Sequence, residues 1–248
     1  MTEQDPGWRL EIHDTLPSTS DLCIERAEAG EAAGLAVLAR RQTRGRGSRG
    51  RSWSEPPAGN LALSVLLRPK DADEAPGLWP FLAGLALHQA LRGDHDRSPL
   101  ILKWPNDVML NGRKLAGILV ERGTGGGHDW LVIGFGANLE GVPVLAERQA
   151  ACLAELGQVS PPEKIAERVL AALDGWRTVW RGAGFAAIRD AWLARAHAVG
   201  TPIEIRGAVE RKTGRFAGID TDGALLLSID GRQERVGTGE ILLLGSGR

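Results

Sequence analysis

Arginine and glycine alternate in one short segment of the chain, and together they suit the binding of anions. Residues 41–53 read RQTRGRGSRGRSW. Six arginines fall between Arg40 and Arg51 with no acidic residue among them. Guanidinium groups donate hydrogen bonds to phosphate and carboxylate oxygens, and the amides of a glycine-rich turn can wrap the same oxygens. This segment, called the arginine loop below, is the first candidate functional site.

Three known motifs fit the arginine loop. Gly45, Gly47 and Gly50 have the G-x-G-x-x-G spacing of a dinucleotide-binding turn. Gly45 and Gly50, followed by Arg51 and Ser52, nearly match a P-loop with arginine in place of lysine. The third motif is an arginine-glycine segment that follows a nucleic-acid backbone. The first two motifs need a helix directly after the glycines, because phosphate binds at its amino end. Pro56 and Pro57 follow instead, which excludes both motifs. Nucleic-acid binding and a solvated charged loop stay open.

Two lysines form the second candidate site. Lys103 ends one predicted strand, and Lys114 begins another after a tight turn. Only five of the thirty basic residues are lysines, so a compact ammonium group at these two places favours a specific role. Lys114 precedes Leu115, Ala116 and Gly117, a wall of small and apolar residues where one cation can hold a carboxylate or phosphate oxygen. An exposed lysine at the edge of a sheet is the plainer alternative.

The composition limits the class of protein. The 248 residues suffice for one large domain or for a large and a small one. The formal net charge is −1, so any electrostatic capture of anions must be local. Cys23 and Cys152 lie far apart in the sequence, which argues against a disulfide framework and a structural zinc site. Because the chain has neither a leader pattern nor a long apolar run, we expect a cytoplasmic protein without a membrane span.

The predicted elements place both candidates in one mixed α/β unit. Strands are expected at residues 35–39, 61–67, 100–104 and 130–136, a hairpin at 107–121, and helices at 21–29, 80–91, 160–180 and 185–197. Ser18 should cap the first helix, and Ser160 with Glu163 should form a capping box for the third. Short strands separated by turns follow from residue 201 and predict a small barrel.

Five stretches follow one another in a characteristic order. They are Ser18-Thr19-Ser20, Gln42 with GRGSRGRSW, KWPNDV from Lys103, KLAGILVE from Lys114, and GFGANL from Gly134. Together they resemble the biotin protein ligase family over nearly the whole chain. The resemblance implies an α/β (α+β) fold, with a mixed sheet flanked by helices in a class II synthetase-like catalytic domain at residues 1–198. A small SH3-like β-barrel is implied at residues 199–248.

The resemblance also implies an activity. Biotin would attack the α-phosphate of ATP to give biotinoyl-AMP, and a specific lysine of a carboxylase biotin carrier domain would then take the biotin. ATP and Mg²⁺ are implied, the latter bridging phosphates without a dedicated protein cage. The partner would be an apo biotin carboxyl carrier protein, and a homodimer is compatible with the family. Only about eleven residues precede the matched region, too few for a helix-turn-helix module, so no operator DNA is expected.

The family's functional residues map onto this sequence in three groups. The catalytic group is Lys114, Arg46 and Asp107, and no residue is assigned to a metal. The biotin-binding group is Ser18, Thr19, Ser20, Gln42, Gly45, Arg46, Gly47, Ser48, Lys114 and Gly117. The nucleotide-binding group is Arg49, Arg51, Trp53, Asn106, Lys114 and Asn138. Asp107 would accept a proton from the incoming lysine, although an ion pair with Arg113 or Lys114 is its simpler role. Trp53 would stack on adenine, and a core tryptophan is the alternative.

Two positions depart from the family pattern. Ser48 stands where many members have an arginine associated with holding the acyl-adenylate, so Arg49 or Arg44 would have to take over part of that role. Ser20 stands where asparagine is frequent, which would change the recognition of the biotin ureido group or admit a water.

Two alternative functions remain at this point. A lipoate or octanoate ligase shares the core fold and the acyl-adenylate chemistry, but the arginine loop and KWPNDV favour biotin. A nucleic-acid-binding protein would use the arginine loop as a salt-dependent contact to phosphates.

Overall fold

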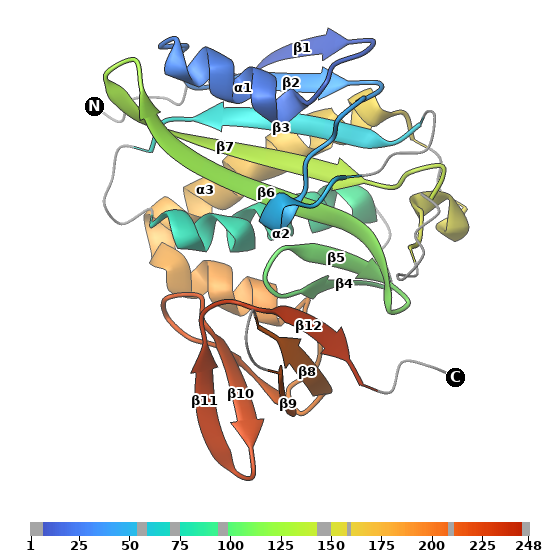
Figure 1. The fold of residues 1–248 in the computed structure, drawn as a ribbon, viewed down its shortest axis with the longest axis vertical. Helices are drawn as coiled ribbons and strands as arrows, with labels where there is room; N and C mark the ends of the chain where they lie inside the picture. The colour runs from blue at the N-terminus through green and yellow to red at the C-terminus, as the bar shows by residue number, and fades with distance from the viewer. Residues whose placement is uncertain are drawn as a thin grey trace.

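The chain forms a large mixed sheet with helices packed on it and a smaller antiparallel sheet (Figure 1). The computed structural model describes residues 7–53, 59–69, 75–93, 99–142, 150–157, 160–207 and 211–244. The strands of the large sheet are, in chain order, β1 (Arg9–His13), β2 (Leu35–Ala39), β3 (Leu61–Leu67), β4 (Leu100–Lys103), β5 (Asp107–Leu110), β6 (Arg113–Gly125) and β7 (His128–Ala137). The expected strands at 35–39 and 61–67 are confirmed to the residue.

The large sheet has the order β1-β2-β3-β7-β6-β5-β4. Only the β1–β2 pair is parallel among the paired strands of this sheet. β6 follows β5 through the expected hairpin, whose turn residues Asn111 and Gly112 both have positive φ. β3, β7 and β6 lie at the centre of this sheet. β3 is buried throughout, and Ala116, Ile118 and Phe135 continue the buried apolar surface across β6 and β7, which gives an apolar floor for a site.

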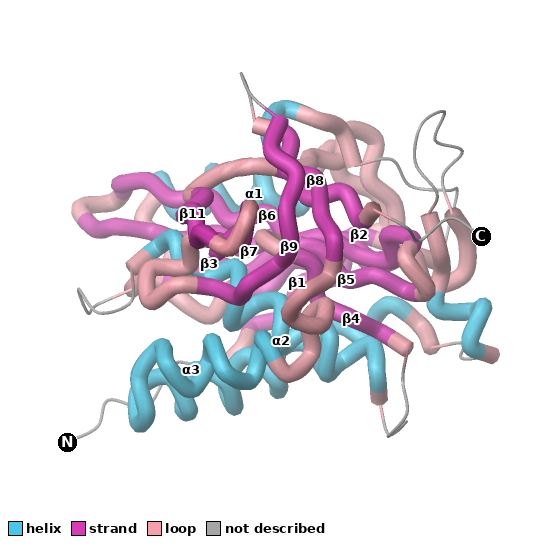
Figure 2. Tube along the Cα trace, turned by 90° about the horizontal axis from the view of Figure 1, so that it is seen from below, coloured by secondary structure: helices cyan, strands magenta, loops and turns pink. Residues whose placement is uncertain are grey.

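Helices cover the two faces of the large sheet unequally. α1 (Thr19–Glu28) packs on one face against β2 and β3, while α2 (Trp79–Arg92) and α3 (Pro162–Leu193) form a layer on the other (Figure 2). Alternation along β2 explains the division, because successive side chains point to opposite faces. Leu35 and Val37 join the small core under α1, and Ala36 and Leu38 join the large core under α2 and α3.

The first helix begins as the sequence predicts. Ser18 is its N-cap residue, and its hydroxyl accepts a hydrogen bond from the amide of Asp21. The cap directs the first turn of α1, including Thr19 and Ser20, toward the centre of the large sheet. Three 3₁₀ turns complete the helical elements of the described residues: η1 (Ser48–Gly50), η2 (Pro76–Leu78) and η3 (Leu153–Leu156).

The long helix α3 differs from the sequence prediction at its start and at its end, and agrees with it in the middle. The predicted capping box is wrong, because Pro161 is the N-cap residue and Glu163 instead forms an ion pair with Arg40, 3.0 Å away. The predicted interruption between two helices is confirmed at Gly184, where φ is 70° and the helix bends. The second half ends at Leu193, four residues earlier than expected, because the chain there turns to meet the edge of β4.

The C-terminal strands form a five-stranded antiparallel sheet of order β11-β10-β9-β8-β12. They are β8 (Pro202–Arg206), β9 (Arg211–Ile219), β10 (Leu225–Ile229), β11 (Arg232–Val236) and β12 (Glu240–Leu243). No ladder joins the outer strands β11 and β12 within the residues described, so closure of this sheet into a barrel stays a prediction. Trp104, after β4, fixes this sheet to the larger one by donating a hydrogen bond to the carbonyl of Gly223.

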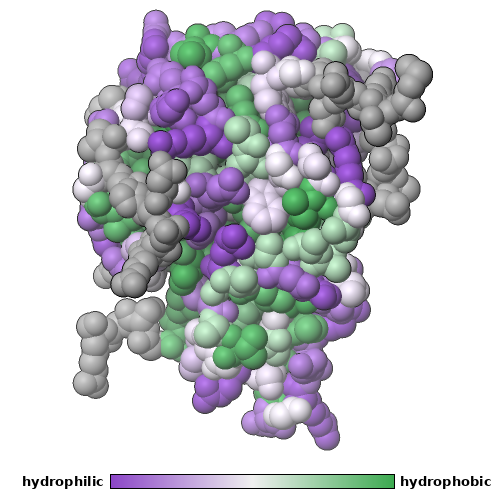
Figure 3. Space-filling view, turned by 180° about the vertical axis from the view of Figure 1, so that it is seen from behind, coloured by the Kyte–Doolittle hydropathy of each residue, from purple (hydrophilic) through white to green (hydrophobic). Residues whose placement is uncertain are grey.

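The molecular surface is mixed in polarity. Hydrophilic and hydrophobic residues are interspersed on the side seen from behind (Figure 3). Across the described residues, no helix is both long enough and apolar enough to cross a membrane.

Candidate active site

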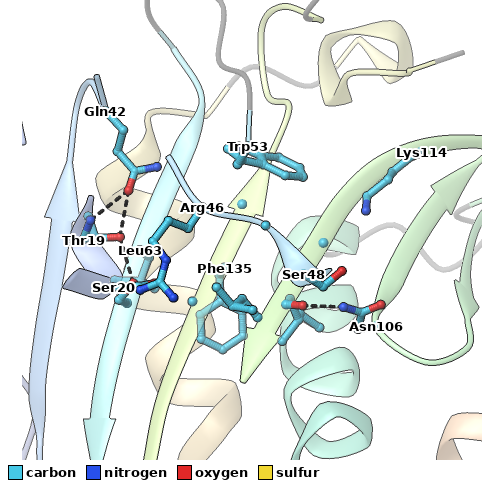
Figure 4. Close-up of a pocket in the computed structure, with 17 residues that line it drawn as sticks. Thr19, Ser20, Gln42, Arg46, Ser48, Trp53, Leu63, Asn106, Lys114 and Phe135 are labelled. Atoms are coloured by element: carbon cyan, nitrogen blue, oxygen red, sulfur yellow. Dashed lines mark hydrogen bonds between the residues drawn. The ribbon is translucent and has the colours of Figure 1, made fainter. Parts of the chain in front are cut away.

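A pocket opens where the first turn of α1, the arginine loop and the central strands meet (Figure 4). Its described lining residues are Thr19, Ser20, Gln42, Arg46, Gly47, Ser48, Trp53, Leu63, Ser64, Asn106, Lys114, Gly117, Ile118, Leu119, Gly134, Phe135 and Gly136. Polar residues of α1 lie at one end, and Lys114 lies at the other end, across Phe135.

Hydroxyl groups gather at the α1 end of the pocket. Ser64 on β3 is fully buried, and its hydroxyl lies 2.8 Å from that of Thr19 and 3.0 Å from that of Ser20. The Gln42 side-chain oxygen accepts hydrogen bonds from the amide and the hydroxyl of Thr19. We call these four residues the hydroxyl cluster. Each hydroxyl has one hydrogen to donate and two acceptor positions, and the Gln42 amide has both donors and an acceptor. The cluster can therefore offer donors and acceptors to a small polar ligand group.

The arginine loop is held in shape by its own backbone. The amide of Gly47 donates to the carbonyl of Arg51, and the amide of Trp53 donates to the carbonyl of Gly45. Gly45 is buried, and a Cβ atom there would lie 2.7 Å from the Trp53 carbonyl oxygen. The glycine therefore permits the close approach of the two ends of the loop.

The predicted arginines of the loop point in different directions. Arg46 lines the pocket and forms ion pairs with Asp21, at 2.6 Å, and with Glu121. Arg51 pairs instead with Glu240 of β12, 3.2 Å away, and Arg49 is exposed. The structure brings Arg46 to the pocket but leaves Arg49 and Arg51 outside its lining.

Trp53 covers part of the pocket floor. Its indole ring lies on two glycines, because a Cβ atom at Gly136 would come within 2.5 Å of the ring and one at Gly117 within 3.4 Å. The Lys114 ammonium lies 5.7 Å from the ring centroid. The buried indole Nε1 finds no hydrogen-bond partner in the described part of the chain, and the same is true of the core residue Trp79, so this feature does not separate a core role from stacking on adenine.

Lys114, in the pocket lining, forms an ion pair with Asp107 just outside it. The Lys114 ammonium lies 2.5 Å from one Asp107 oxygen, and Lys103 lies 3.0 Å from the other. Burial acts to raise the pKa of the Asp107 carboxyl, but the charges and hydrogen bonds of Lys114 and Lys103 outweigh it and hold the pKa below its ordinary value. Of the two expected partners, Lys114 is found, whereas Arg113 pairs with Glu155.

The two predicted asparagines lie beside the pocket in different ways. Asn106 lines it and donates through its side-chain amide to the carbonyl of Ile118. Asn138 is buried behind the lining and donates to the carbonyl of Ala151. Its side-chain oxygen finds no partner among the residues that the structure describes, which leaves an acceptor available.

Comparison with known proteins identifies the chain. Residues 14–138 match the Biotin/lipoate A/B protein ligase family, and residues 200–244 match the Biotin protein ligase C terminal domain. The chain belongs to the biotin/lipoate protein ligase family. A Biotin--[acetyl-CoA-carboxylase] ligase of Paracoccus denitrificans is 42% identical over 77% of this chain and 82% of the relative. Another, of Mycobacterium tuberculosis, is 33% identical over 96% of this chain and 90% of the relative.

A solved structure has the same fold. The biotin protein ligase from Aquifex aeolicus, in complex with biotin and ATP, matches with a TM-score of 0.79 and 27% identity. The match covers 95% of this chain and 98% of that chain. The likeness therefore includes both sheets, and it confirms the resemblance that the five sequence stretches indicate.

This ligase-family pocket contains residues that the sequence did not single out as site residues. They are Leu63, Ser64, Ile118, Leu119, Gly134, Phe135 and Gly136. Gly134 through Gly136 belong to the GFGANL stretch, but nothing in that stretch tells which strand face meets the pocket. Ser64 stands alone within the apolar run LALSVLL of β3, and a buried polar residue in such a run is the signal that could have found it.

Some predicted residues lie outside the lining. Ser18 caps α1 rather than facing the pocket, and Gly45 supports the loop from behind. Arg49, Arg51, Asp107 and Asn138 are also outside the lining. Cys23 lies on the buried face of α1, and burial raises the pKa of its thiol to about 12.

Proposed function

We propose that this chain adenylates biotin with ATP and then transfers biotin to a lysine of a carboxylase carrier domain. The observation that carries the proposal is a pocket with two unlike ends. The hydroxyl cluster suits a neutral ureido group, Lys114 suits carboxylate and phosphate oxygens, and apolar residues lie between them. Both relatives are biotin--[acetyl-CoA-carboxylase] ligases and the Aquifex aeolicus structure holds biotin and ATP, which agrees with this chemistry.

The hydroxyl cluster would recognise biotin. Thr19, Ser20 and Gln42 would hydrogen-bond the ureido group, with Ser64 as a fourth member. A site built from buried polar groups rejects ligands that leave those groups unpaired, so an acid with a purely apolar tail would bind poorly. Ser18 would contribute indirectly, by fixing the first turn of α1.

The cationic side chains would bring two anions together. The biotin carboxylate and the α-phosphate of ATP repel each other, and Lys114 and Arg46 can screen that repulsion while holding the oxygens in line. Gly45, Gly47 and Ser48 would contribute loop backbone near the acyl chain, and Gly117 lets the biotin rings approach the strand. Arg46 would first exchange Asp21 or Glu121 for substrate oxygens.

The nucleotide would lie on the Trp53 side of Lys114. Trp53 would stack on adenine, with Asn106 of the pocket lining beside the nucleotide, and the unpaired side-chain oxygen of Asn138 would accept a hydrogen bond from it. Arg49 and Arg51 would approach the phosphates from the loop. Because Arg51 is engaged by Glu240, its approach requires a change of partner.

Mg²⁺ would enter as MgATP. Within the described residues, no three His, Cys, Asp or Glu side chains gather as a metal site. The carboxylates nearest the pocket, Asp21, Asp107 and Glu121, are engaged by Arg46, Lys103 and Lys114. This donor set fits an ion held chiefly by phosphate oxygens, which would neutralise their charge.

Asp107 is the candidate to assist the second step, in which the carrier lysine attacks biotinoyl-AMP. Its carboxylate is charged and beside Lys114, but its lowered pKa makes it a weak base. The ion pair with Lys114 supports the simpler of its two expected roles. The apo carrier protein, a homodimer, cytoplasmic localisation and the domain division at residues 1–198 and 199–248 remain predictions.

The two alternative functions receive less support. In a lipoate or octanoate ligase, the α1 end of the pocket would receive the apolar part of the acid. The four hydrogen-bonding residues at that end would then have no partner on the ligand, which would weaken its binding. Nucleic-acid binding would use the arginine loop, but three of the six arginines at residues 40–51 already pair with carboxylates of the chain itself, namely Arg40, Arg46 and Arg51.

ATP–pyrophosphate exchange tests the proposal without the carrier. Exchange should occur with biotin and be absent with lipoate or octanoate as the only carboxylate. Exchange with lipoate or octanoate alone would move the assignment to the sister ligases. Folded protein with no exchange, together with salt-dependent oligonucleotide binding that persists at saturating ATP and biotin, would favour the nucleic-acid alternative.

A further inference from the structure

Lys103 is a buried charge to which the proposed chemistry assigns no role. It ends β4, and its side chain is 10% exposed, compared with 26% for the pocket-lining Lys114. Its ammonium lies 3.0 Å from one oxygen of Asp107 and donates to the carbonyl of Ile241, 3.3 Å away on β12. A buried lysine requires such partners, but the partners do not explain why the chain keeps a charge there.

The three charges are arranged in a row from the C-terminal sheet to the pocket. Lys103 contacts one oxygen of Asp107 and Lys114 contacts the other, so a single carboxylate serves two ammonium groups. Two positive charges and one negative charge leave one positive charge in excess. His197 is also near Lys103, but burial and the Lys103 charge lower the pKa of this histidine to about 4, so it adds no charge at neutral pH.

A second cation matters when Lys114 contacts substrate. For Lys114 to hold a phosphoryl or carboxylate oxygen, it must weaken its 2.5 Å contact with Asp107. Asp107 is only 9% exposed, so water would not replace the lost partner. An unpaired buried carboxylate is strongly destabilised, and that penalty would oppose the movement of Lys114.

We propose that Lys103 is a positioning residue that keeps Asp107 paired while Lys114 moves from Asp107 onto the reacting oxygens. This inference rests on the proposed adenylation function and deepens it. Lys103 touches no substrate in this scheme and acts only through Asp107. Its hydrogen bond to Ile241 holds it in place from the C-terminal sheet, so it stays behind when Lys114 leaves.

The test compares Lys103→Met in two backgrounds, using biotin-dependent ATP–pyrophosphate exchange. Methionine keeps the length of the side chain and removes its charge. In the native background, Lys103→Met should lower kcat of exchange by about tenfold or more, because Lys114 is then the sole counterion of Asp107. Biotin affinity, which depends on the hydroxyl cluster, should change by less than about threefold. In the Asp107→Asn background the same substitution should change kcat by less than about threefold, since no carboxylate remains to be paired.

The controls separate the possible failures. Lys164→Met, which removes an exposed lysine of α3, should leave exchange within about twofold. Wild-type protein without exchange would overturn the proposed function itself, whereas active wild type with an unaffected Lys103→Met variant would overturn only the role of Lys103. If Lys103→Met alone does not fold, the comparison of Asp107→Asn with the double variant still decides, because a loss of kcat of about tenfold or more there would mean that Lys103 acts independently of Asp107.

Discussion

The two ends of the pocket are built by different means. At the α1 end, Thr19, Ser20 and Ser64 are almost fully buried and hydrogen-bond one another. At the other end, Lys114 has a side chain that is 26% exposed and pairs with the carboxylate of Asp107. The loop residues Arg46 and Arg51 are more than one third exposed and likewise pair with carboxylates of the protein. The hydroxyl cluster can therefore receive a ligand almost as it stands, whereas the cations must exchange partners before they can bind one.

The difference has a physical reason. Neutral hydroxyl groups can be buried in the absence of ligand if they bond to each other, at little cost in desolvation. Several cations close together repel one another, so a chain that carries them must supply anions when substrate is absent. Asp21, Glu121, Asp107 and Glu240 supply those anions here. Recognition of biotin and activation of its carboxylate should thus respond separately to mutation.

The largest effect is expected from Lys114→Ala, which removes the cation that we propose holds the reacting oxygens. It should lower kcat of biotin-dependent ATP–pyrophosphate exchange by about 10²- to 10³-fold. Folding should suffer less, because Asp107 keeps Lys103 as a partner. Exchange kinetics and thermal unfolding measure the two effects.

Lys164→Ala is the matched control for Lys114→Ala, since it removes a lysine whose side chain is 57% exposed and far from the pocket lining. An unaltered first-step rate in the Lys114→Ala variant would remove this residue from the catalytic group and erase the proposed difference between the two ends.

The second effect is expected at the other end of the pocket. Ser64→Ala removes the hydroxyl that Thr19 and Ser20 share, and it should raise the Kd for biotin by about tenfold, the equivalent of one or two hydrogen bonds. The kcat of exchange at saturating biotin should change little. Calorimetric titration with biotin gives the affinity. Ser228→Ala, on β10 of the C-terminal sheet, is the control, and an unchanged Kd in the Ser64 variant would show that the cluster does not contact the ligand.

The sequence predicts the hydroxyl cluster less completely than it predicts the strands around it. Continuous apolar runs identify β2 and β3 to the residue, because strands buried on both faces must be apolar throughout. The same rule hides Ser64, since its partners on α1 are distant in sequence. The role of Ser64 becomes visible only when β3 and α1 are packed together.

The arginine loop shows the opposite limit. Its residue types predict an anion site, which stays a prediction, and its glycine spacing predicts a tight loop, which the backbone hydrogen bonds confirm. The sequence does not reveal which arginine enters the pocket, because that depends on carboxylates of α1, β6 and β12. The capping box proposed at Ser160 failed for a related reason: Glu163 is drawn away by Arg40, a residue 123 positions earlier.

The third prediction concerns retention of the intermediate. Ser48 lines the pocket at the start of η1, and neither Arg44 nor Arg49 does. Ser48→Arg should bring one more cation to the acyl-adenylate phosphate and slow the release of biotinoyl-AMP by roughly three- to tenfold. Release is followed by trapping the free intermediate after a single turnover.

Ser52→Arg adds the same charge to the same loop outside the pocket lining, so it controls for a general electrostatic effect. Equal slowing by the two variants would mean that position 48 has no special geometry. No slowing by Ser48→Arg would mean that retention does not depend on this position.

The smallest effect is expected where the loop meets the C-terminal sheet. Glu240 holds Arg51 at 3.2 Å, so ATP must compete with this carboxylate for the guanidinium group. Glu240→Gln removes the competing charge and should lower the KM for ATP by about two- to threefold, in keeping with a partly exposed ion pair. Arg51→Gln should raise the KM for ATP, because the cation itself is lost. The direction of change thus distinguishes the two partners of one contact.

A double-mutant comparison makes the last prediction decisive. If Glu240 acts on ATP only through Arg51, then Glu240→Gln should have no further effect in the Arg51→Gln background. Glu204→Gln, on β8 of the same sheet, is the control because Glu204 pairs with Arg206 rather than with the loop. A rise in KM on Glu240→Gln would mean that the carboxylate positions Arg51 for the phosphates instead of competing with them. The ion pairs of the loop would then belong to a preformed site, and the two ends of the pocket would be alike after all.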